Sequence, residues 1–395
     1  MKRILHSVID KVYNWQNLAV ASRKVVGNKG SGGVDRMSVQ AWAKKEEQHL
    51  SSLQNRLKKG SYRSKPALRR YIDKPGSKKK RPLGIPAVSD RVCQQAVLNV
   101  LSPVFESYFH EDSHGFRPGR STETAAKRVE ELRKQGLRHV VDLDIKGFFD
   151  HVDHEILMKL VRQVVKDRRV LGLIRGWLTA GVLEEGTVRY GTSGTPQGGV
   201  ISPLLSNVYL TVLDNALTEA GHRFVRYADD VVLLCRHEEE ATEALQLTRT
   251  VLGRLKLEIN EEKTVVTTFK AGFDFLGFHF TSRSRSIATK SLLALYAKVR
   301  EVTRRAQGDR PVESVIATLN PLLRGWGTYH RYGRNVGMFT KLDKWVRKRL
   351  RSYLHKRWRT RTWSSPTPSR EDFEQMGLFS MRSILRPEKL QLMLF

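Results

Sequence analysis

The chain has 395 residues, more than a single hydrophobic core usually holds, so we expect at least two packed domains. A hydrophobic fraction of 40% excludes a disordered chain. The 70 Lys and Arg residues outnumber the 40 Asp and Glu and leave a net charge of +30. This charge predicts a polyanionic partner, nucleic acid in the first place, with a solubility charge or an anionic membrane surface as alternatives.

The sequence argues against several other classes of protein. Cys93 and Cys235 lie far apart, without a Cys-x-x-Cys pair or a histidine at zinc-binding spacing, which excludes a disulfide framework or a zinc module. No stretch approaches the roughly 20 apolar residues that span a bilayer, and the amino terminus lacks the apolar run of a signal peptide. We therefore expect a cytoplasmic protein that does not enter a membrane.

The amino-terminal segment predicts short helices around a glycine-rich loop, Val25–Asp35. Its four glycines permit positive backbone angles, so the loop can lie close to a phosphate backbone. The alternative is a flexible surface loop.

Residues Tyr71–Pro86 predict two short strands joined by a basic turn at Pro75-Gly76. The five cations near the tip are Lys74, Lys78, Lys79, Lys80 and Arg81. Such a tip suits a triphosphate, because Lys binds its oxygens as a point charge and Arg binds them through paired hydrogen bonds. A solvated charged tip is the alternative.

A buried helix is predicted over Ser89–Phe109, and His139–Ile145 then predicts a buried strand that carries two carboxylates, Asp142 and Asp144. A turn and a helix near 153–165 follow. Residues two apart on a strand face the same way, so the pattern alone leaves open which aspartate is functional.

A glycine-rich patch, Gly191–Pro203, opens a mostly apolar helix that runs towards Leu217. The β-rich runs 224–227 and 231–234 then flank Ala228-Asp229-Asp230, which predicts a tight hairpin with two acids at its tip, and a further strand is expected near 273–280. A solvated Asp-Asp turn is the alternative.

Acids on apolar strands favour a metal site. Asp144 and Asp229 would lose several kcal/mol on desolvation unless a cation compensates, as order-of-magnitude transfer costs indicate. Joining nucleotides needs two divalent metals held by carboxylates on rigid strands, and magnesium prefers oxygen ligands.

From Ser291 onwards the pattern is helical, and between Tyr296 and Trp363 the sequence has 18 Lys and Arg against 4 Asp and Glu. An apolar stripe is formed by Phe339, Leu342, Trp345, Val346, Leu350, Tyr353 and Leu354. Cations occupy the other faces, so this helix can pack and bind a polyanion at once. A membrane-surface helix is the alternative.

Three motifs carry a resemblance to a known family. They are Gly115–Ser121, Asp144–Asp150 and Phe224–Asp230, and matching blocks follow in order from Gly33-Val34-Asp35 to Trp358. In these the sequence closely resembles the bacterial group II intron reverse transcriptases, also called intron-encoded maturases.

The resemblance implies a metal-binding triad of Asp144, Asp229 and Asp230, with Ile145 as a further metal ligand. Two Mg²⁺ ions are expected, with Mn²⁺ as a possible substitute. Asp144 rather than Asp142 is implied because the family's steric-gate aromatic lies five residues later, at Phe149, where it would exclude a 2′-hydroxyl. An ordinary core phenylalanine is the alternative for Phe149, a part that we assign to its neighbour Phe148.

The resemblance also implies residues that bind nucleotide and nucleic acid. Lys74 and Arg81 would grip the triphosphate, Gln197 would lie beside the incoming dNTP, and Lys263 would assist pyrophosphate departure unless it is a surface lysine. The expected template, primer and RNA contacts are Gly33, Arg117, Arg120, Phe278, Arg324, Trp326, Tyr329, Arg331, Lys344, Arg347, Lys348 and Arg351. Phe278 would act through the backbone of a primer-grip hairpin, and Trp326 has a buried position as its alternative.

The expected fold class is α+β, a right-hand polymerase with an antiparallel palm sheet. The expected domains are an amino-terminal extension (1–65), fingers and palm (66–286), an α-helical thumb or maturase domain (287–363) and a short tail (364–395) without an endonuclease.

The expected function is RNA-directed DNA synthesis, together with binding of the parent group II intron RNA to assist its splicing and to copy it during retrohoming. The expected partners are intron RNA, an RNA template with a DNA primer made elsewhere, dNTPs and target DNA, at the nucleoid when the protein acts on DNA. A reverse transcriptase recruited to repair or defence and a non-catalytic RNA-binding splicing cofactor are the alternatives. The sequence leaves open whether the protein is a monomer or a dimer.

Overall fold

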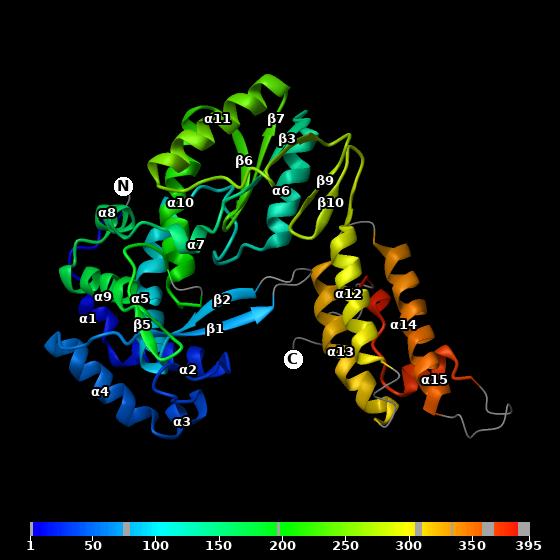
Figure 1. Cartoon of the computed structure of the whole chain (residues 1–395), viewed down its shortest axis with the longest axis horizontal. Coiled ribbons are helices and arrows are strands. Elements are labelled where there is room, and N and C mark those ends of the chain that lie inside the picture. The colour runs from blue at the N-terminus through cyan, green and yellow to red at the C-terminus, as the bar shows by residue number, and fades with distance from the viewer. Residues whose placement is uncertain are drawn as a thin grey trace. The chain divides into compact units, whose positions relative to one another are not determined.

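The computed structural model describes residues 3–73, 80–195, 198–304, 310–332, 335–357 and 367–385. The chain is an α+β protein that forms two compact units, Met1–Thr268 and Phe269–Phe395 (Figure 1). This division falls before the expected boundary between palm and thumb at 286/287, because the strands after Thr268 pack with the carboxy-terminal helices.

The central sheet of the first unit has the strand order β6-β7-β3-β8. It consists of β6 (Arg223–Tyr227), β7 (Asp230–Cys235), β3 (His139–Asp144) and β8 (Val265–Thr268), and every neighbouring pair is antiparallel. The expected antiparallel sheet and its acid-tipped hairpin are therefore confirmed. Val231 to Cys235 are all buried, which is why this stretch reads as a continuous apolar run.

Some helices pack on the central sheet, and others extend the core away from it. They are α6 (Thr122–Lys134), α7 (Phe148–His151), α8 (His154–Val164), α9 (Arg168–Thr179), α10 (Ser202–Glu219) and α11 (Glu238–Arg254). Several begin at side-chain caps: Ser121 forms a capping box with Thr124, and Asp153 and Asp167 accept backbone N–H bonds at the starts of α8 and α9. Asp167 also accepts from the N–H groups of Val8 and Ile9, which ties the amino terminus to α9.

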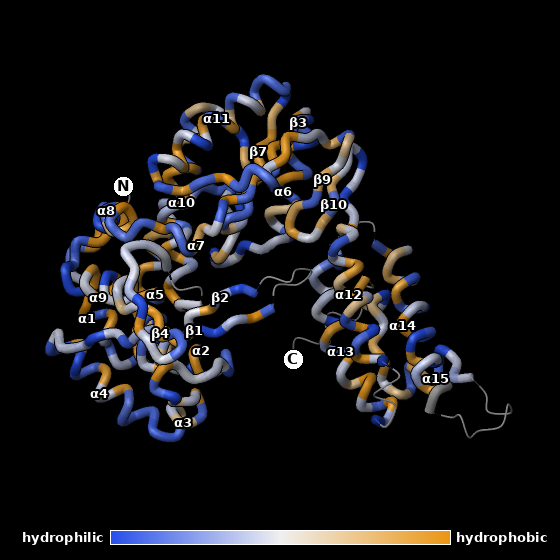
Figure 2. The backbone as a smooth tube through the Cα atoms, viewed as in Figure 1, coloured by the Kyte–Doolittle hydropathy of each residue, from blue (hydrophilic) through white to orange (hydrophobic). Residues whose placement is uncertain are grey.

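A second sheet carries the expected basic hairpin, β1 (Ala67–Asp73) and β2 (Lys80–Ile85). The strands β4 (Val182–Glu184) and β5 (Thr187–Arg189) extend it in the order β2-β1-β4-β5, with β1 and β4 parallel. In Figure 2 the hairpin is mainly hydrophilic towards its tip, whereas β3 and β7 are largely hydrophobic. A solvated hairpin beside a buried sheet explains the contrast.

The remaining helices of the first unit precede and follow this hairpin. They are α1 (Ile9–Val12), α2 (Trp15–Gly27), α3 (Val39–Lys44), α4 (Glu46–Lys59), α5 (Val88–Phe105) and the 3-10 turn η1 (Glu106–Tyr108). The predicted buried helix near 89–109 is confirmed by α5, whose Val92, Ala96, Val97 and Leu101 are fully buried.

The second unit consists of a small antiparallel sheet and helices. The strands are β9 (Phe273–Phe275), β10 (Phe278–Phe280) and β11 (Arg285–Ile287), and the helices are α12 (Thr289–Val302), α13 (Val312–Tyr329), α14 (Val336–Arg357), α15 (Arg370–Gln375) and the 3-10 turn η3 (Met381–Leu385). The predicted stripe on α14 is confirmed, since all its members are buried except Trp345, which is partly buried.

The segment after residue 363, which we expected to be a short tail, contributes to the core of the second unit. Phe373 and Met381 have no exposed surface. Asp343 of α14 accepts hydrogen bonds from the N–H groups of Met381 (3.0 Å) and Arg382 (3.2 Å) and from the Ser380 hydroxyl (2.6 Å). These contacts make the segment an integral layer of the unit.

Two exclusions drawn from the sequence can be compared with this fold. In the parts of the chain that the structure describes, no helix combines the length and the apolar character needed to cross a membrane. Cys93 and Cys235 are both buried, free thiols.

Candidate active site

Three aspartates meet at one end of the central sheet. Asp144, the last residue of β3, is directly opposite Asp230, the first residue of β7, so both carboxylates project on one face. Asp229 occupies the turn between β6 and β7. Asp142 is opposite Val232 and therefore lies two residues further from the turn along each strand. The strand register thus brings Asp144, and not Asp142, opposite Asp230, and we call Asp144, Asp229 and Asp230 the carboxylate site.

The carboxylate site concentrates negative charge that the surrounding protein only partly offsets. Desolvation, together with the nearby Asp229 and Asp144 carboxylates, raises the pKa of Asp230 to about 6, although part of its surface faces solvent. Desolvation and then Asp144 also raise the pKa of Asp229. Arg81 of β2 acts in the opposite direction on both acids, so the basic hairpin and the carboxylate site share one electrostatic environment.

Lys263 is the cation in direct contact with this site. Its Nζ lies 2.8 Å from Oδ2 of Asp144. With this pair formed, the described residues contain no group of three or more His, Cys, Asp or Glu side chains in position to hold a metal ion. The donor set itself suits a divalent cation, because clustered, partly desolvated carboxylates with raised pKa values are stabilised by positive charge.

A buried ion pair supports the turn that carries Asp229. Arg226 of β6 and Asp214 of α10 have fully buried side chains and meet through two contacts, Nε to Oδ1 at 2.7 Å and Nη2 to Oδ2 at 2.5 Å. Nη1 of Arg226 also donates to the carbonyl of Ala228 at 3.0 Å and to the side-chain oxygen of Asn207 at 3.0 Å. Ala228 itself has a φ of 59°, so the arginine stabilises the strained residue just before Asp229.

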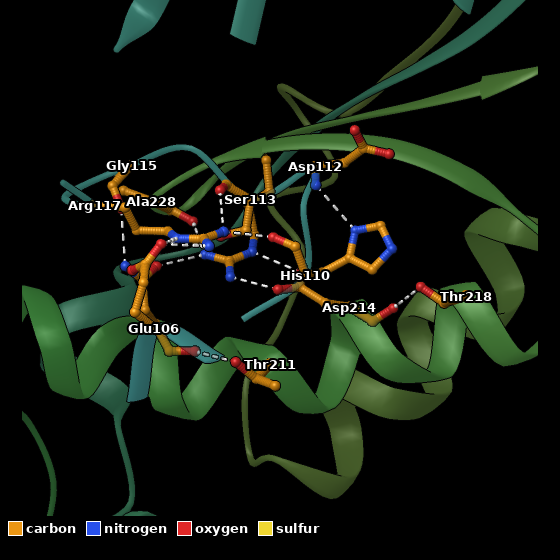
Figure 3. Close-up of polar contacts among 12 residues, drawn as sticks. Glu106, His110, Asp112, Ser113, Gly115, Arg117, Thr211, Asp214, Thr218 and Ala228 are labelled. Carbon is orange, nitrogen blue, oxygen red and sulfur yellow. Dashed lines mark hydrogen bonds and ion pairs between the residues drawn. The ribbon is translucent and has the colours of Figure 1, made fainter. Parts of the chain in front are cut away.

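The same group of residues fixes the loop 112–117 against the turn that carries Asp229 (Figure 3). Asn207 donates to the Gly115 carbonyl at 2.8 Å. The backbone N–H and the carbonyl of Arg226 both form hydrogen bonds with the backbone of the loop. A Cβ at Gly115 would lie 2.2 Å from the Ala228 nitrogen, so only glycine fits there. This support was not predicted from the sequence, although the lone Arg226 inside the apolar run Phe224–Tyr227 is a signal for it, because a buried charge requires a partner.

Comparison with known proteins agrees with this geometry. Residues 72–280, more than half of the chain, match the family model "Reverse transcriptase (RNA-dependent DNA polymerase)". The chain belongs to the reverse transcriptase family. Residues 292–367 match a second model, "Group II intron, maturase-specific domain".

Two curated relatives extend the match along the chain. Protein YkfC of Escherichia coli (strain K12) is 37% identical over 313 residues, which cover 68% of this chain and 81% of YkfC. The group II intron-encoded protein LtrA of Lactococcus lactis subsp. cremoris is 32% identical over 337 residues, which cover 69% of this chain and 56% of LtrA. The chain therefore spans only a little over half the length of LtrA.

The structure describes some of the residues that the sequence predicted to bind the nucleotide. Phe149 is half-buried and packs edge-on against the core residue Phe148, with ring centres 5.2 Å apart. Its carbonyl accepts a hydrogen bond from the N–H of Thr195 at 2.8 Å, and it lines a cavity of about 220 Å³. Lys74 and Gln197 lie outside the described residues.

The two arginines predicted to bind template or primer in the Gly115–Ser121 motif are placed differently from each other. Arg117 has a side chain only 4% exposed and bonds to Glu106 and to the carbonyls of His110 and Ser113. This placement differs from the predicted role, because the buried guanidinium finds its partners inside the protein. Arg120 is partly exposed and donates to the Glu111 carbonyl.

The glycine-rich loop of the reverse transcriptase is held against α5. Gly33 is buried, and a Cβ there would lie 2.7 Å from the backbone of Ala87. Arg91 donates to the carbonyl of Ser31 at 2.6 Å, and Asp35 forms an ion pair with Lys65 at 3.0 Å. The loop is thus anchored, and a role of Gly33 at the template stays a prediction.

In the second unit, the predicted primer-grip hairpin packs on α13. Phe278 has no exposed surface and stacks on Tyr329 with ring centres 5.8 Å apart. The Tyr329 hydroxyl donates to the Leu276 carbonyl at 3.0 Å, and Tyr329 remains 40% exposed. Trp326 is half-buried and packs against His330. Phe278 can therefore reach a ligand only through its backbone, whereas Tyr329 presents ring surface.

The cations predicted to bind RNA also divide by exposure. Lys344 and Lys348 are exposed on α14. Arg347 and Arg351 are half-buried, and Arg351 donates to the Pro368 carbonyl at 2.8 Å. The other two predicted cations are Arg324 and Arg331. Arg324 is exposed, and its Cζ lies 4.3 Å from the ring centre of Phe379. Arg331 is half-buried, and its Cζ lies 4.5 Å from the ring centre of Tyr332.

Proposed function

We propose that the chain is an active RNA-directed DNA polymerase that binds group II intron RNA, assists its splicing and copies it into cDNA during retrohoming. The observation that carries the proposal is the register that sets Asp144 opposite Asp230, next to Asp229 and within the electrostatic reach of Arg81. A reverse transcriptase with a vestigial site would have no reason to keep three carboxylates on one face at the cost of their desolvation.

The proposed cofactors are two Mg²⁺ ions, with Mn²⁺ as a substitute, held by Asp144, Asp229 and Asp230 with Ile145. When bound, divalent ions activate the primer 3′-oxygen and stabilise the leaving pyrophosphate. In the proposed loaded state, Lys263 releases Asp144 and becomes available to the pyrophosphate. The exchange is reasonable because the Lys263 side chain is 53% exposed and an exposed ion pair stabilises little, about 0–1 kcal/mol.

The chain's own residues would then bind and select the nucleotide. Arg81 contacts the triphosphate, together with Lys74, and Phe149 restricts the space beside the sugar so that a 2′-hydroxyl is excluded. Gln197 lies beside the nucleotide. The Thr195 bond to the Phe149 carbonyl supports this role, since it fixes the backbone from which the ring projects.

The intron-binding part of the proposal rests on the second unit. Its match to the maturase-specific domain and the exposed Lys344 and Lys348 support binding of intron RNA, because exposed cations bind phosphates. LtrA is an intron-encoded protein by name. The proposed partners are intron RNA, an RNA template with a DNA primer, dNTPs and target DNA, and the proposed location is the cytoplasm, at the nucleoid when the protein acts on DNA.

Primer extension tests the polymerase assignment. Asp144→Asn should abolish extension of a DNA primer on an RNA template with Mg²⁺. The matched control is Asp142→Asn, which removes a carboxylate two residues away on the same strand and should leave most of the activity. Full activity of Asp144→Asn, or of Asp229→Ala with Asp230→Ala, would exclude the proposed site.

Two alternatives predict different results. For a reverse transcriptase recruited to repair or defence, sequencing of the RNA that copurifies with the full chain would find no intron RNA, although primer extension is intact. A non-catalytic splicing cofactor would support splicing without extending a primer. The proposal requires both activities, and it also requires that splicing survive in the Asp229→Ala, Asp230→Ala variant.

A further inference from the structure

Phe116 stands out in the loop between η1 and α6 because two features coincide there. Its side chain is 53% exposed, and its backbone has a φ of 58°, in the left-handed region. A bulky residue rarely adopts this conformation, since its Cβ crowds the following carbonyl. Such strain persists only where the surroundings impose it, and it is concentrated at functional sites.

The residues on both sides of Phe116 impose this conformation (Figure 3). Gly115 packs so closely on Ala228 that a Cβ would lie 2.2 Å from its nitrogen, and its carbonyl accepts from Asn207. Arg117 is buried and bonds to Glu106 at 2.6 and 2.9 Å. With both neighbours fixed inward, the chain must turn at the residue between them.

Phe116 therefore holds an exposed aromatic ring next to the catalytic turn. Its neighbour Gly115 contacts Ala228, and Ala228 precedes the metal-ligand candidate Asp229. Phe116 stacks on no other ring among the described residues. The ring is exposed to solvent on a rigid frame, one residue from the glycine that packs on the turn carrying Asp229.

We propose that Phe116 binds the primer–template duplex, with its ring against the sugar and base edges in the minor groove close to the primer end. An RNA–DNA hybrid has A-form geometry, and A-form helices present a wide, shallow minor groove that a flat ring can contact. Aromatic contacts of this kind tolerate any sequence, as a polymerase requires. The inference rests on the proposed polymerase function.

The chemistry of the surroundings favours nucleic acid over a protein partner. A single exposed ring is not the contiguous apolar patch that a docked protein needs. Phe116 instead lies in a chain of net charge +30, four residues before the partly exposed Arg120, and its neighbour Gly115 packs on the turn that carries Asp229. A cation and an aromatic ring together form the usual surface for nucleic acid.

Phe116→Gly in the full-length chain gives a sharp test, because glycine adopts a positive φ without strain. The melting temperature should stay unchanged or rise, whereas the Kd for a labelled RNA template annealed to a DNA primer should increase about tenfold, in line with the loss of one aromatic contact. The dNTP KM should change little. Phe116→Tyr, which keeps the ring, should restore binding.

Glu185→Gly is the matched control. Glu185 also has a positive φ, 49°, in the turn between β4 and β5. This variant measures what glycine does to stability at such a position and should leave primer–template binding unchanged.

The outcomes separate the inference from the proposed function. Wild-type binding by Phe116→Gly in an enzyme that extends primers would overturn the inference and leave the polymerase standing. A melting temperature well below that of wild type, with Phe116→Tyr also impaired in binding, would overturn it by assigning Phe116 a structural role. If the wild-type protein does not extend primers, the proposed polymerase function is refuted. The Kd values of wild type and Phe116→Gly would still decide whether Phe116 binds the duplex.

Discussion

The ion pair between Arg226 and Asp214 allows the support of the turn that carries Asp229 to be separated from the stability of the fold. In Asp214→Asn, Arg226 remains in a position with 0% side-chain exposure and has lost its counter-charge. Removal of one partner from a buried pair costs about 3–5 kcal/mol, which is a large share of the roughly 5–15 kcal/mol by which proteins are stable. We therefore expect Asp214→Asn to lower the urea midpoint strongly.

The double variant Arg226→Met, Asp214→Leu should behave differently. Replacement of a buried pair by apolar side chains of similar volume is often neutral for stability, so most of the loss in Asp214→Asn should be recovered. The Ala228 carbonyl, however, no longer receives the 3.0 Å hydrogen bond from Arg226, and neither does Asn207. A shift of about 1 Å at Asp229 would lower the extension rate by roughly 10²-fold.

Urea unfolding and primer extension at saturating dNTP, with a Mg²⁺ titration, measure the two effects. The control is Arg128→Met, Asp112→Leu, which removes a mostly buried pair with 2.5 Å separation but keeps the Asp112 backbone carbonyl that accepts from the Arg226 N–H. Its extension rate should stay close to wild type. The reasoning is refuted if the Arg226→Met, Asp214→Leu variant regains stability and also extends primers at the wild-type rate.

Two further predictions concern single side chains. Phe149→Ala should raise the incorporation of ribonucleotides relative to deoxyribonucleotides by about 10–100-fold, as measured by kcat/KM, because a pocket discriminates a small group by about 1–3 kcal/mol. An unchanged ratio would exclude Phe149 as the residue that rejects the 2′-hydroxyl. Burial lowers the pKa of His330 to about 4, below the value near 6.5 in the unfolded chain. The unfolded state therefore binds the proton first, and the free energy of unfolding decreases as the pH falls from 6.5 to 4. The loss, about 3 kcal/mol at most, should be absent in urea unfolding of His330→Phe, and equal pH slopes in both proteins would contradict it.

The sequence predicted those features whose determinants lie within one element. The acid-tipped hairpin, the two strands of the basic hairpin and the stripe on α14 each follow from a local period or turn signal, and all are present; the basic turn at 74–79 lies outside the described residues. The choice between Asp142 and Asp144 could not be made in this way, because it depends on which residue of β7 is opposite each of them. Register is a property of two strands, and the pattern of one strand does not contain it.

Where the structure differs from what the sequence suggested, the cause is a contact with residues outside the motif itself. A charged motif such as Gly115–Ser121 reads as a surface that binds phosphate, yet Arg117 is satisfied by Glu106 and by loop carbonyls. The segment after 363 reads as a tail, since it is short and its apolar residues follow no long helical period. The burial of Phe373 and Met381 depends on their packing with α13 and α14, which are distant in the sequence.

The positive charge of the chain therefore serves two purposes that the composition does not distinguish. Arg226 and Arg117 are buried, act on carboxylates and carbonyls, and cannot release counterions from nucleic acid. Lys344, Lys348 and Arg81 are exposed, so the salt dependence of binding must come from cations of this second kind. The buried arginines fix the turn that carries Asp229 and the loop that carries Phe116, so in the proposed function they act through geometry, whereas the exposed cations are the ones that can hold a polyanion.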